Sequence, residues 1–250
     1  RTIMKRSGSI LEINGRRFDL RKIPKLWAIG AGKAAAPMGQ AVEKILGRYL
    51  AGGILVTKYG HGLPLKKLSI AEAGHPLPDA NSASSAIQMM SLAKKQIEPD
   101  DLVLCLLSGG ASSLLASPAD GISLEDKLEC TRLLLNSGAD IYELNAVRKH
   151  LSNIKGGGLA RLLSPAQAIG LVLSDVVGDD LGTIASGPMA PDGTTFGDCL
   201  EIFQKLRVAE KVPPAVMRRF ELGAAGQIGE TPKKNDPIFQ RIENLIIGSN

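Results

Sequence analysis

Short apolar runs bounded by glycine recur along the chain and predict the strands of its main sheet. They cover residues 26–29, 53–56, 102–107, 168–173 and 245–247, and a further short strand is expected over 69–73. Runs that are apolar at nearly every position are typical of strands buried on both faces, as in a parallel sheet covered by helices.

Segments with helical periodicity lie between these runs. Ala35, Met38 and Val42 share one face of a helix expected over 35–46, and a less regular pattern covers 87–93. Residues 123–126 resemble a capping box that opens a helix ending before Gly138, and another helix is expected over 141–151. The alternation predicts a doubly wound α/β fold, a Rossmann-like three-layer arrangement with a mostly parallel sheet, over residues 23–250.

The two ends of the chain differ from this pattern. Residues 1–22 are expected to form a small β-hairpin packed on the main domain, because Asn14-Gly15 stands between two alternating segments. Residues 223–234 are glycine-rich and polar, which predicts a mobile loop. Residues 245–250 resemble a strand that enters a ligand-facing loop with no helix after it, so we expect the chain to be cut before a further domain.

Composition narrows the class of protein. The 250 residues are 44% hydrophobic, enough for a full core, and the 28 glycines indicate many tight turns. The net charge of +5 comes from scattered lysines and arginines without interleaved aromatics, which argues against nucleic-acid binding. No segment approaches the ~18 apolar residues of a membrane span, and no charged-then-apolar leader precedes Ser7. We therefore expect a cytoplasmic protein without a membrane partner, although the sequence opens in mid-pattern.

Cysteine and histidine do not form disulfide or metal patterns. Cys105, Cys130 and Cys199 are an odd, widely spaced set, and His61 and His150 have no partners at metal-ligand spacing. There is also no G-x-S-x-G motif and no serine or cysteine beside a base. The sequence therefore does not indicate hydrolase chemistry.

Candidate chemistry gathers where strands are expected to end, the edge at which open α/β sheets bind ligands. Gly30-Ala31-Gly32-Lys33 follows the first strand, so the amides of the next helix and the Lys33 charge could bind phosphate. Residues 30–35 also fit the dinucleotide motif G-x-G-x-x-A, but Thr57-Lys58 follows the second strand where that motif requires an acid. The Walker motif is absent, and a plain turn with an exposed lysine is the structural alternative.

Two further loops carry polar groups after predicted strands. Ser108-Gly109-Gly110-Ala111-Ser112 could form an amide concavity for phosphate oxygens, with serine caps on a helix as the alternative. Asp175 and Asp179 follow a third strand and could bind Mg²⁺, which needs only one or two carboxylates beside nucleotide phosphates. Aspartates that merely cap a turn are the alternative reading.

Cations and a stiff loop complete the candidate set. Asn145 and Arg148 share a helix face and could present an amide and a guanidinium to a carboxylate or phosphate, while Lys149 is expected to face solvent. Lys155 before three glycines could contact an anion, or be a solvated lysine at a helix exit. In a loop stiffened by two prolines, His75 and Asp79 could orient a small hydroxy acid or simply cap a turn.

Taken together and in this order, the motifs resemble the class II glycerate kinases, the glycerate 2-kinase family. The resemblance covers nearly the whole chain, and it is carried by Gly30-Ala-Gly-Lys33-Ala34, Gly74-His-Pro-Leu-Pro-Asp79, Leu107-Ser-Gly-Gly-Ala-Ser112, Glu143 to Lys149, Leu151 to Leu159, Leu173 to Asp179, Ile184 to Pro188 and Ile247 to Asn250.

The resemblance implies transfer of the ATP γ-phosphoryl group to the 2-hydroxyl of D-glycerate, giving 2-phosphoglycerate, with ATP and Mg²⁺ bound. Lys33 matches the family's catalytic lysine, and we expect Arg148 and Asp175 to act with it. The general base stays open between Asp175 and Asp79. The family's catalytic arginine lies in a C-terminal domain without a counterpart here, so the chain alone is expected to be almost inactive. Homo-oligomerisation stays open.

Two other functions remain at this stage. Members of the family are also named hydroxypyruvate reductases, so an NAD(P)-dependent reductase is the enzymatic alternative, although Thr57-Lys58 argues against it. A non-catalytic sugar-phosphate-binding domain would use the same loops without turnover.

Overall fold

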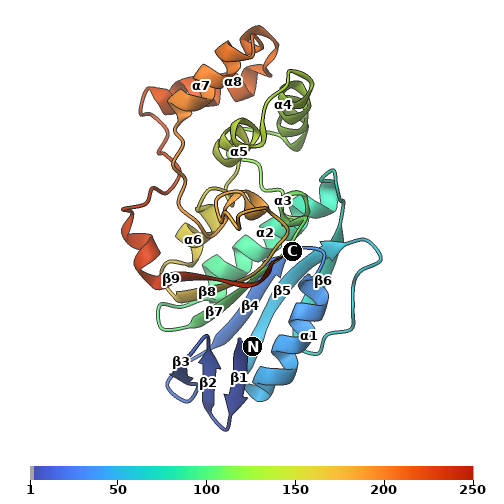
Figure 1. The fold of residues 1–250 in the computed structure, drawn as a ribbon, viewed down its shortest axis with the longest axis vertical. Helices are drawn as coiled ribbons and strands as arrows, with labels where there is room; N and C mark the ends of the chain where they lie inside the picture. Colours follow the sequence, from blue (N-terminus) through green and yellow to red (C-terminus); the bar gives the residue numbers. More distant parts are fainter. Residues whose placement is uncertain (1–2, 250) are drawn as a thin grey trace.

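A six-stranded parallel sheet lies at the centre of the computed structural model, which describes residues 3–249 (Figure 1). Every predicted strand falls within an observed one, so the predicted parallel sheet is confirmed. Asn250, predicted to end a ligand-facing loop, lies outside the described residues. The strands are β4 (Leu26–Ala31), β5 (Leu50–Lys58), β6 (Leu68–Ala73), β7 (Leu102–Leu107), β8 (Gln167–Ser174) and β9 (Ile242–Ser249).

The order of the strands reverses between β4 and β7. From β4 the chain moves outward through β5 to β6, then returns to β7 on the other side of β4 and continues to β8 and β9, giving the order β6-β5-β4-β7-β8-β9. This is the order of a doubly wound nucleotide-binding sheet, in which ligands bind beyond the carboxyl ends of the two strands at the reversal. The topology therefore places a candidate site at the ends of β4 and β7.

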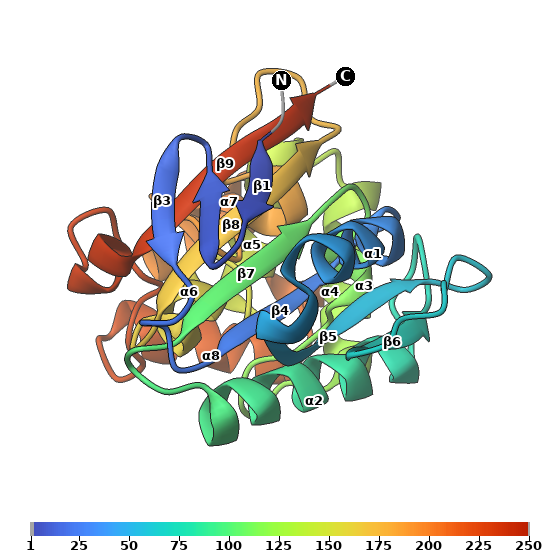
Figure 2. The same cartoon turned by 90° about the horizontal axis from the view of Figure 1, so that it is seen from below.

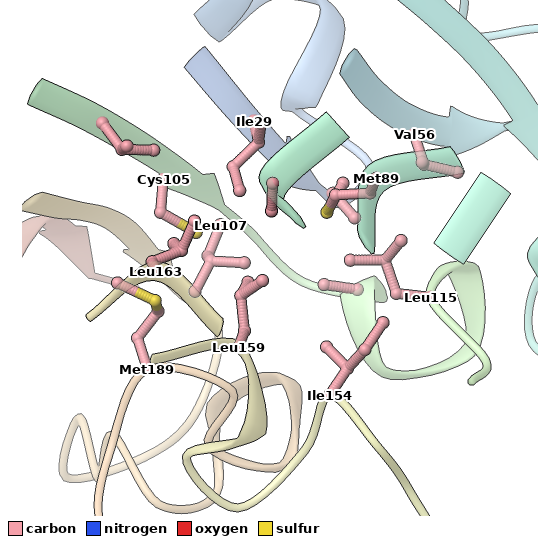
Figure 3. Packing of buried hydrophobic residues seen from close by; sticks show 14 of the residues in the cluster. Ile29, Val56, Met89, Cys105, Leu107, Leu115, Ile154, Leu159, Leu163 and Met189 are labelled. Carbon is pink, nitrogen blue, oxygen red and sulfur yellow. The ribbon is translucent and has the colours of Figure 1, made fainter. Parts of the chain in front are cut away.

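Helices cover both faces of this sheet. On one face lies α1 (Ala35–Leu46), and on the other lie α2 (Ala80–Gln96), α3 (Ala111–Leu114) and α6 (Gly158–Leu163) (Figure 2). Figure 3 shows the core on the face covered by α2, α3 and α6, where residues such as Ile29 and Cys105 of the strands meet Met89 and Leu159 of the helices. Among residues 3–249, no helix combines the length and apolar character that crossing a membrane requires.

A small antiparallel sheet packs beside α1. It consists of β1 (Met4–Ser7), β2 (Ile10–Ile13) and β3 (Arg16–Asp19), and buried Leu11 joins it to the core of the main sheet. The predicted hairpin turn is confirmed, since Asn14 and Gly15 have φ values of 49° and 85° and connect β2 to β3. The additional strand β1 makes the sheet three-stranded rather than a simple hairpin.

Four helices form a separate group that stands away from the sheet (Figure 1). The sequence predicted the first two of them, but it predicted neither the last two nor their packing on one another. Aromatic rings fill their shared core, with Phe196 and Phe203 both in contact with Phe220. The helices are α4 (Leu124–Asn136), α5 (Ile141–His150), α7 (Phe196–Lys205) and α8 (Pro214–Ala224), and the short 3₁₀ turns of the chain are Gly47–Tyr49, Ile184–Ser186, Ala209–Lys211 and Pro237–Arg241.

A buried ion pair lies within this helical group. Asp192 is 1% exposed, and it accepts hydrogen bonds from Lys149 Nζ at 3.2 Å, Thr194 Oγ1 at 2.8 Å and Thr231 Oγ1 at 3.0 Å. Lys149, which the sequence placed in solvent, is only 8% exposed, because its ammonium reaches this carboxylate. The cluster therefore holds α5 against the segments before α7 and after α8.

The segment after α8 is more firmly attached than its composition predicted. Glu230 Oε2 lies 3.0 Å from His150 Nε2, and Asp192 N donates to Pro232 O at 2.8 Å. The expectation of a mobile loop over 223–234 was based on glycine content and polarity alone. Partners on α5 and before α7 instead anchor its second half.

Candidate functional site

The loops after β4 and β7 meet where the strand order reverses. Ser108 N donates to Ala31 O at 3.1 Å, and Lys33 N donates to Gly109 O at 2.9 Å. The Ser108 hydroxyl, which is buried, accepts a hydrogen bond from Ala34 N at 3.0 Å. Two segments that the sequence predicted separately as phosphate loops thus form one hydrogen-bonded floor.

Close backbone packing accounts for the first two glycines of this floor. A Cβ on Gly30 would lie 1.9 Å from Leu106 O of the neighbouring strand, and one on Gly32 would lie 2.0 Å from Ser108 Oγ. Their φ values of 155° and 140° add a conformation that other residues rarely adopt. The sequence predicted these glycines as ligand-binding residues, and the geometry gives them the role of bringing the two loops together.

An alanine scan of the floor should separate packing from ligand contact. Gly30→Ala is expected to lower the free energy of unfolding of the full-length protein by ~1–3 kcal/mol or more, because the methyl group meets backbone atoms that cannot move away. Gly109→Ala is expected to cost much less, because the atoms nearest to its methyl group belong to the carboxylate end of the flexible Asp175 side chain, with Oδ2 at 2.0 Å. Urea unfolding measures both, and equal losses would contradict the packing role of Gly30.

An open hollow of about 460 Å³ lies above the floor, and we call it the Lys33 hollow. Its charged groups are Lys33 and Asp175, both exposed, and the Asp175 carboxylate rests directly against the backbone of Gly109. Gly248 and Ser249, at the end of β9, contribute to its lining. The lining residues are Lys33, Ala34, Ser108, Gly109, Leu173, Ser174, Asp175, Gly248 and Ser249.

The His75 ring lies at the side of this floor. A Cβ on Gly110, which has a φ of 86°, would lie 2.8 Å from the His75 ring and 3.4 Å from Lys33 Cε. Burial lowers the pKa of His75, and the charges of Lys33 and Lys58 lower it further. The imidazole therefore favours its neutral form beside the lysine that faces the hollow.

Asp79 has a structural role in the described chain. It caps α2: its Oδ1 accepts from Ser82 N at 2.9 Å, and its Oδ2 accepts from the Tyr59 hydroxyl at 2.6 Å. Burial alone would raise the pKa of this carboxyl, but the hydrogen bonds from Tyr59 and Ser82 lower it to about 2. Asp79 lines neither this hollow nor the one described next, which leaves Asp175 as the better placed of the two predicted proton acceptors.

A second hollow, of about 380 Å³, opens on the other side of Asp175, which lines both. We call it the Arg148 hollow. Its floor is polar and its rim carries exposed apolar side chains, Tyr142 and Val177 among them. The lining residues are Ser112, Ile141, Tyr142, Asn145, Arg148, Asp175, Val176, Val177, Asp180, Thr183, Ala185 and Ser186.

The floor of the Arg148 hollow is a hydrogen-bonded network around Ser112. Arg148 Nη2 donates to Ser112 Oγ at 2.6 Å, and Lys155 Nζ donates to Ser112 O at 2.6 Å and Oγ at 3.1 Å. The hydroxyls of Ser112 and Ser186 are 2.8 Å apart, and Ser186 donates to Asn145 Oδ1 at 3.0 Å. The structure thus joins Asn145, Arg148 and Lys155, which the sequence predicted as one cationic stretch, to a serine predicted in another loop.

Three basic side chains lie at this floor without a carboxylate partner among residues 3–249: Lys127 and Lys155, which are buried, and Arg148, which is partly buried. Lys155 is 2% exposed, and burial holds the pKa of its ammonium well below the usual range, with Arg148 and Lys127 adding to the effect. Burial likewise lowers the pKa of Lys127 to about 7. Among residues 3–249, no ion pair with a carboxylate involves these three side chains. The alternative that Lys155 is a solvated lysine at a helix exit is therefore wrong.

A metal site is less complete than the sequence suggested. Asp179 lies in a turn with a φ of 54° and lines neither hollow. The carboxylate of Asp180 accepts from Gly182 N at 3.0 Å and from Thr183 Oγ1 at 2.6 Å. In the described part of the chain no group of three or more His, Cys, Asp or Glu side chains could hold a metal. Asp175 alone fits Mg²⁺, which can be held by one carboxylate and the phosphates of a nucleotide.

Ser186 is a site residue that the sequence reasoning left out. It lies in a turn where Ala185, Ser186 and Gly187 have φ values of 55°, 61° and 64°. Left-handed non-glycine residues cost on the order of 1–3 kcal/mol each and gather at functional sites. Gly156 N holds this turn by donating to Ser186 O at 3.0 Å. The only sequence signal was a Ser-Gly-Pro segment, which does not predict that the serine faces a ligand.

Comparison with known proteins connects this geometry to a family. Residues 1–221 match the model of a domain of unknown function, DUF4147. A glycerate 2-kinase from Pyrococcus horikoshii is 44% identical over 238 residues, which cover 95% of this chain and 52% of that protein. A putative hydroxypyruvate reductase from Agrobacterium vitis is 47% identical over 197 residues, or 79% of this chain and 50% of that protein.

A solved structure agrees with the sequence comparison. The crystal structure of glycerate kinase from Thermotoga maritima superposes with a TM-score of 0.81 at 41% identity, and the match covers 91% of this chain and 52% of that one. The chain spans about half the length of the relatives it matches.

Proposed function

Because the chain belongs to the DUF4147 family, whose matched relatives include glycerate kinases, we propose that it forms part of an enzyme that phosphorylates D-glycerate. The donor is ATP, the acceptor group is the 2-hydroxyl, and the product is 2-phosphoglycerate. One observation carries the proposal: a lysine-lined hollow at the strand-order reversal adjoins a smaller cationic hollow across a single carboxylate, Asp175. Such a pair suits a polyphosphate donor beside a small acid.

Phosphoryl transfer requires alignment and positive charge where negative charge develops. Lys33 lines the Lys33 hollow and would stabilise the transferring phosphoryl group. The amides at the start of α1 are largely in use, because Ala34 N donates to Ser108 Oγ, Ala35 N donates to Gly32 O at 3.1 Å and residue 37 is a proline, so the Lys33 ammonium is the main group for phosphate oxygens. Ser108 and Gly109 hold this helix start in place through their bonds to Ala34 and Lys33.

Asp175 connects the donor and the acceptor. Mg²⁺, when bound, would neutralise charge on the phosphate oxygens, and Asp175 is the residue that would hold it. The same carboxylate also faces the Arg148 hollow, so it can accept the proton of the acceptor hydroxyl. The second catalytic cation that the family resemblance implies would come from outside these residues, so every assay below uses the full-length protein.

Replacement of Asp175 tests the metal assignment. Asp175→Asn should weaken Mg²⁺-dependent ATP binding by at least ~10-fold, because a neutral amide is a poor ligand for Mg²⁺. Titration calorimetry with and without Mg²⁺ measures the change, and Asp100→Asn, at an exposed loop position, serves as the control. Undiminished binding in Asp175→Asn would contradict the assignment. An equal loss in Asp179→Asn would favour the site of two aspartates that the sequence predicted.

The decisive assay is phosphorylation of D-glycerate with ATP, followed by NMR assignment of the phosphorylated carbon. Phosphate on carbon 2 supports the proposal, and phosphate on carbon 3 would refute the choice of hydroxyl. Binding without turnover would favour a non-catalytic sugar-phosphate domain. Oxidation of a reduced nicotinamide by hydroxypyruvate, without ATP, would favour the reductase named among the relatives.

The end of β5 argues against the reductase. A dinucleotide fold needs an acid there to bind the ribose, but Thr57 and Lys58 occupy that position. The nearest carboxylate on the adjacent strand, Glu72, accepts a hydrogen bond from Gly62 N at 2.7 Å. We therefore keep phosphoryl transfer as the function that this site supports best.

A further inference from the structure

The hydroxyl of Ser112 has its hydrogen-bonding roles fixed by its neighbours. Its oxygen accepts from Arg148 Nη2 and from Lys155 Nζ, which uses both of its lone pairs. Its single proton is then left for Ser186 Oγ, and Ser186 donates in turn to Asn145 Oδ1. The chain of hydrogen bonds therefore runs in one direction, from the two cations to the amide oxygen of Asn145.

This direction also orients the amide of Asn145. Because Oδ1 accepts from Ser186, the NH₂ group occupies the other branch of the amide. Asn145 is 4% exposed and lines the Arg148 hollow, and within residues 3–249 its Nδ2 makes no hydrogen bond. The amide donor is thus held in place by its buried side chain, and it is left without a protein partner among the described residues at a point that the hollow can reach, where a ligand oxygen can accept from it.

Arg148 adds more donors of the same kind. Its guanidinium carries five N–H groups, and in the described chain only its bond to the Ser112 side chain is seen. The two carboxylates that line the hollow do not neutralise it, because Asp180 is bonded to Gly182 and Thr183, and Asp175 forms no ion pair with any residue that the structure describes. The floor therefore offers donors and uncompensated positive charge.

We propose that the Arg148 hollow binds the carboxylate of the acceptor, and that it thereby limits acceptors to short 2-hydroxycarboxylates. A carboxylate is planar and monoanionic, so it can accept from the guanidinium fork and from the Asn145 amide together. Its neighbouring carbon then carries the hydroxyl toward Asp175, which borders the Lys33 hollow. The direction of transfer rests on the proposed function, whereas the carboxylate site rests on the donors alone.

Charge favours a carboxylate over a phosphate group in this hollow. Asp175 forms part of its wall, and a dianion would be repelled more strongly than a monoanion. Phosphate oxygens are better matched to the exposed Lys33 ammonium in the other hollow. An acceptor without a carboxylate, such as glycerol, would give the Arg148 guanidinium and the Asn145 amide no anionic partner and should bind at least ~100-fold more weakly than D-glycerate.

Calorimetry on the full-length protein tests this proposal with three probes: D-glycerate, glycerol and inorganic phosphate. Arg148→Lys keeps the charge but loses the fork, and should weaken D-glycerate binding at least ~10-fold. In the same variant, the affinity for ATP in the presence of Mg²⁺ should change by less than ~2-fold. Arg132→Lys, at an exposed position on α4, is the matched control and should change neither. If Arg148→Lys does not fold, Ser186→Ala serves in its place, because it removes the bond that orients Asn145. This variant should also bind D-glycerate more weakly and bind ATP as the wild type does.

Several outcomes would overturn the carboxylate site. These are equal D-glycerate binding by Arg148→Lys and the wild type, weakened binding of ATP instead of D-glycerate, glycerol binding as tight as D-glycerate, and displacement of D-glycerate by inorganic phosphate at equal concentration. Failure of the kinase proposal gives a different result. The wild type would then bind D-glycerate through Arg148 but form no phosphorylated product with ATP, which supports the site and refutes the reaction.

Discussion

Lys33→Ala in the full-length protein is expected to lower kcat for D-glycerate phosphorylation by at least ~100-fold, the scale seen when one charge-stabilising donor is removed. Lys33 is the lysine that lines the hollow at the strand-order reversal. An alanine would leave the developing charge on the phosphoryl oxygens with one cation fewer. The floor of the hollow would keep its backbone bonds, from Ser108 N to Ala31 O and from the residue 33 amide to Gly109 O.

Steady-state kinetics and a control on the same helix make this result specific. Lys44→Ala removes an exposed lysine from the last turn of α1, far from the hollow, and should leave kcat unchanged. The loss in Lys33→Ala should fall on kcat more than on the KM for D-glycerate, because the acceptor binds in the other hollow. A kcat within threefold of the wild-type value would exclude Lys33 from the transferring phosphoryl group.

Asp192→Ala is expected to lower the free energy of unfolding by ~3–5 kcal/mol, the cost of breaking a buried ion pair from one side. The side chain of Asp192 is fully buried, and its removal would leave the ammonium of Lys149, whose side chain is 10% exposed, without a counter-charge. Urea unfolding of the full-length protein measures the loss. The double variant Asp192→Ala/Lys149→Met should be less destabilised than Asp192→Ala, because it also removes the orphaned charge. Additive losses would contradict the ion-pair explanation.

The same carboxylate gives the stability difference a pH dependence. Burial alone would raise the pKa of Asp192, but Lys149 and Thr194 lower it below the ordinary value of 3.8. The native state therefore favours the ionised form, and its contribution is complete above the unfolded pKa and is lost as the pH falls through the folded one. The difference in unfolding free energy between the wild type and Asp192→Ala should shrink below about pH 4.

The sheet was predictable because its strands are buried on both faces. Runs such as 102–107 are apolar throughout, and that pattern does not depend on which elements cover the strand. The helical group was not predictable in the same way. Helix α7 begins with a capping box at Thr195, a signal the sequence reasoning missed, but nothing in the pattern indicates that it packs on α8 rather than on the sheet.

The candidate site was predictable where it follows from the topology. Lys33 and Ser108 were placed together because both follow parallel strands that could be neighbours. Asp79 and Ser186 show the limit of this reasoning. An aspartate that caps a helix and one that faces a ligand have the same sequence signature, and Ser186 reaches its partners only through a left-handed backbone that serine rarely adopts.

The two sides of the candidate site belong to different packing units. Lys33 and Asp175 follow strands of the sheet, whereas Asn145 and Arg148 lie on α5. One face of α5 packs in the helical group, where the rings of His150 and Phe196 meet edge to face with their centroids 4.6 Å apart. Substitutions in that aromatic core can shift α5 relative to the sheet without altering the phosphate floor. Acceptor preference can therefore diverge among descendants of one ancestral sequence while the donor site stays unchanged.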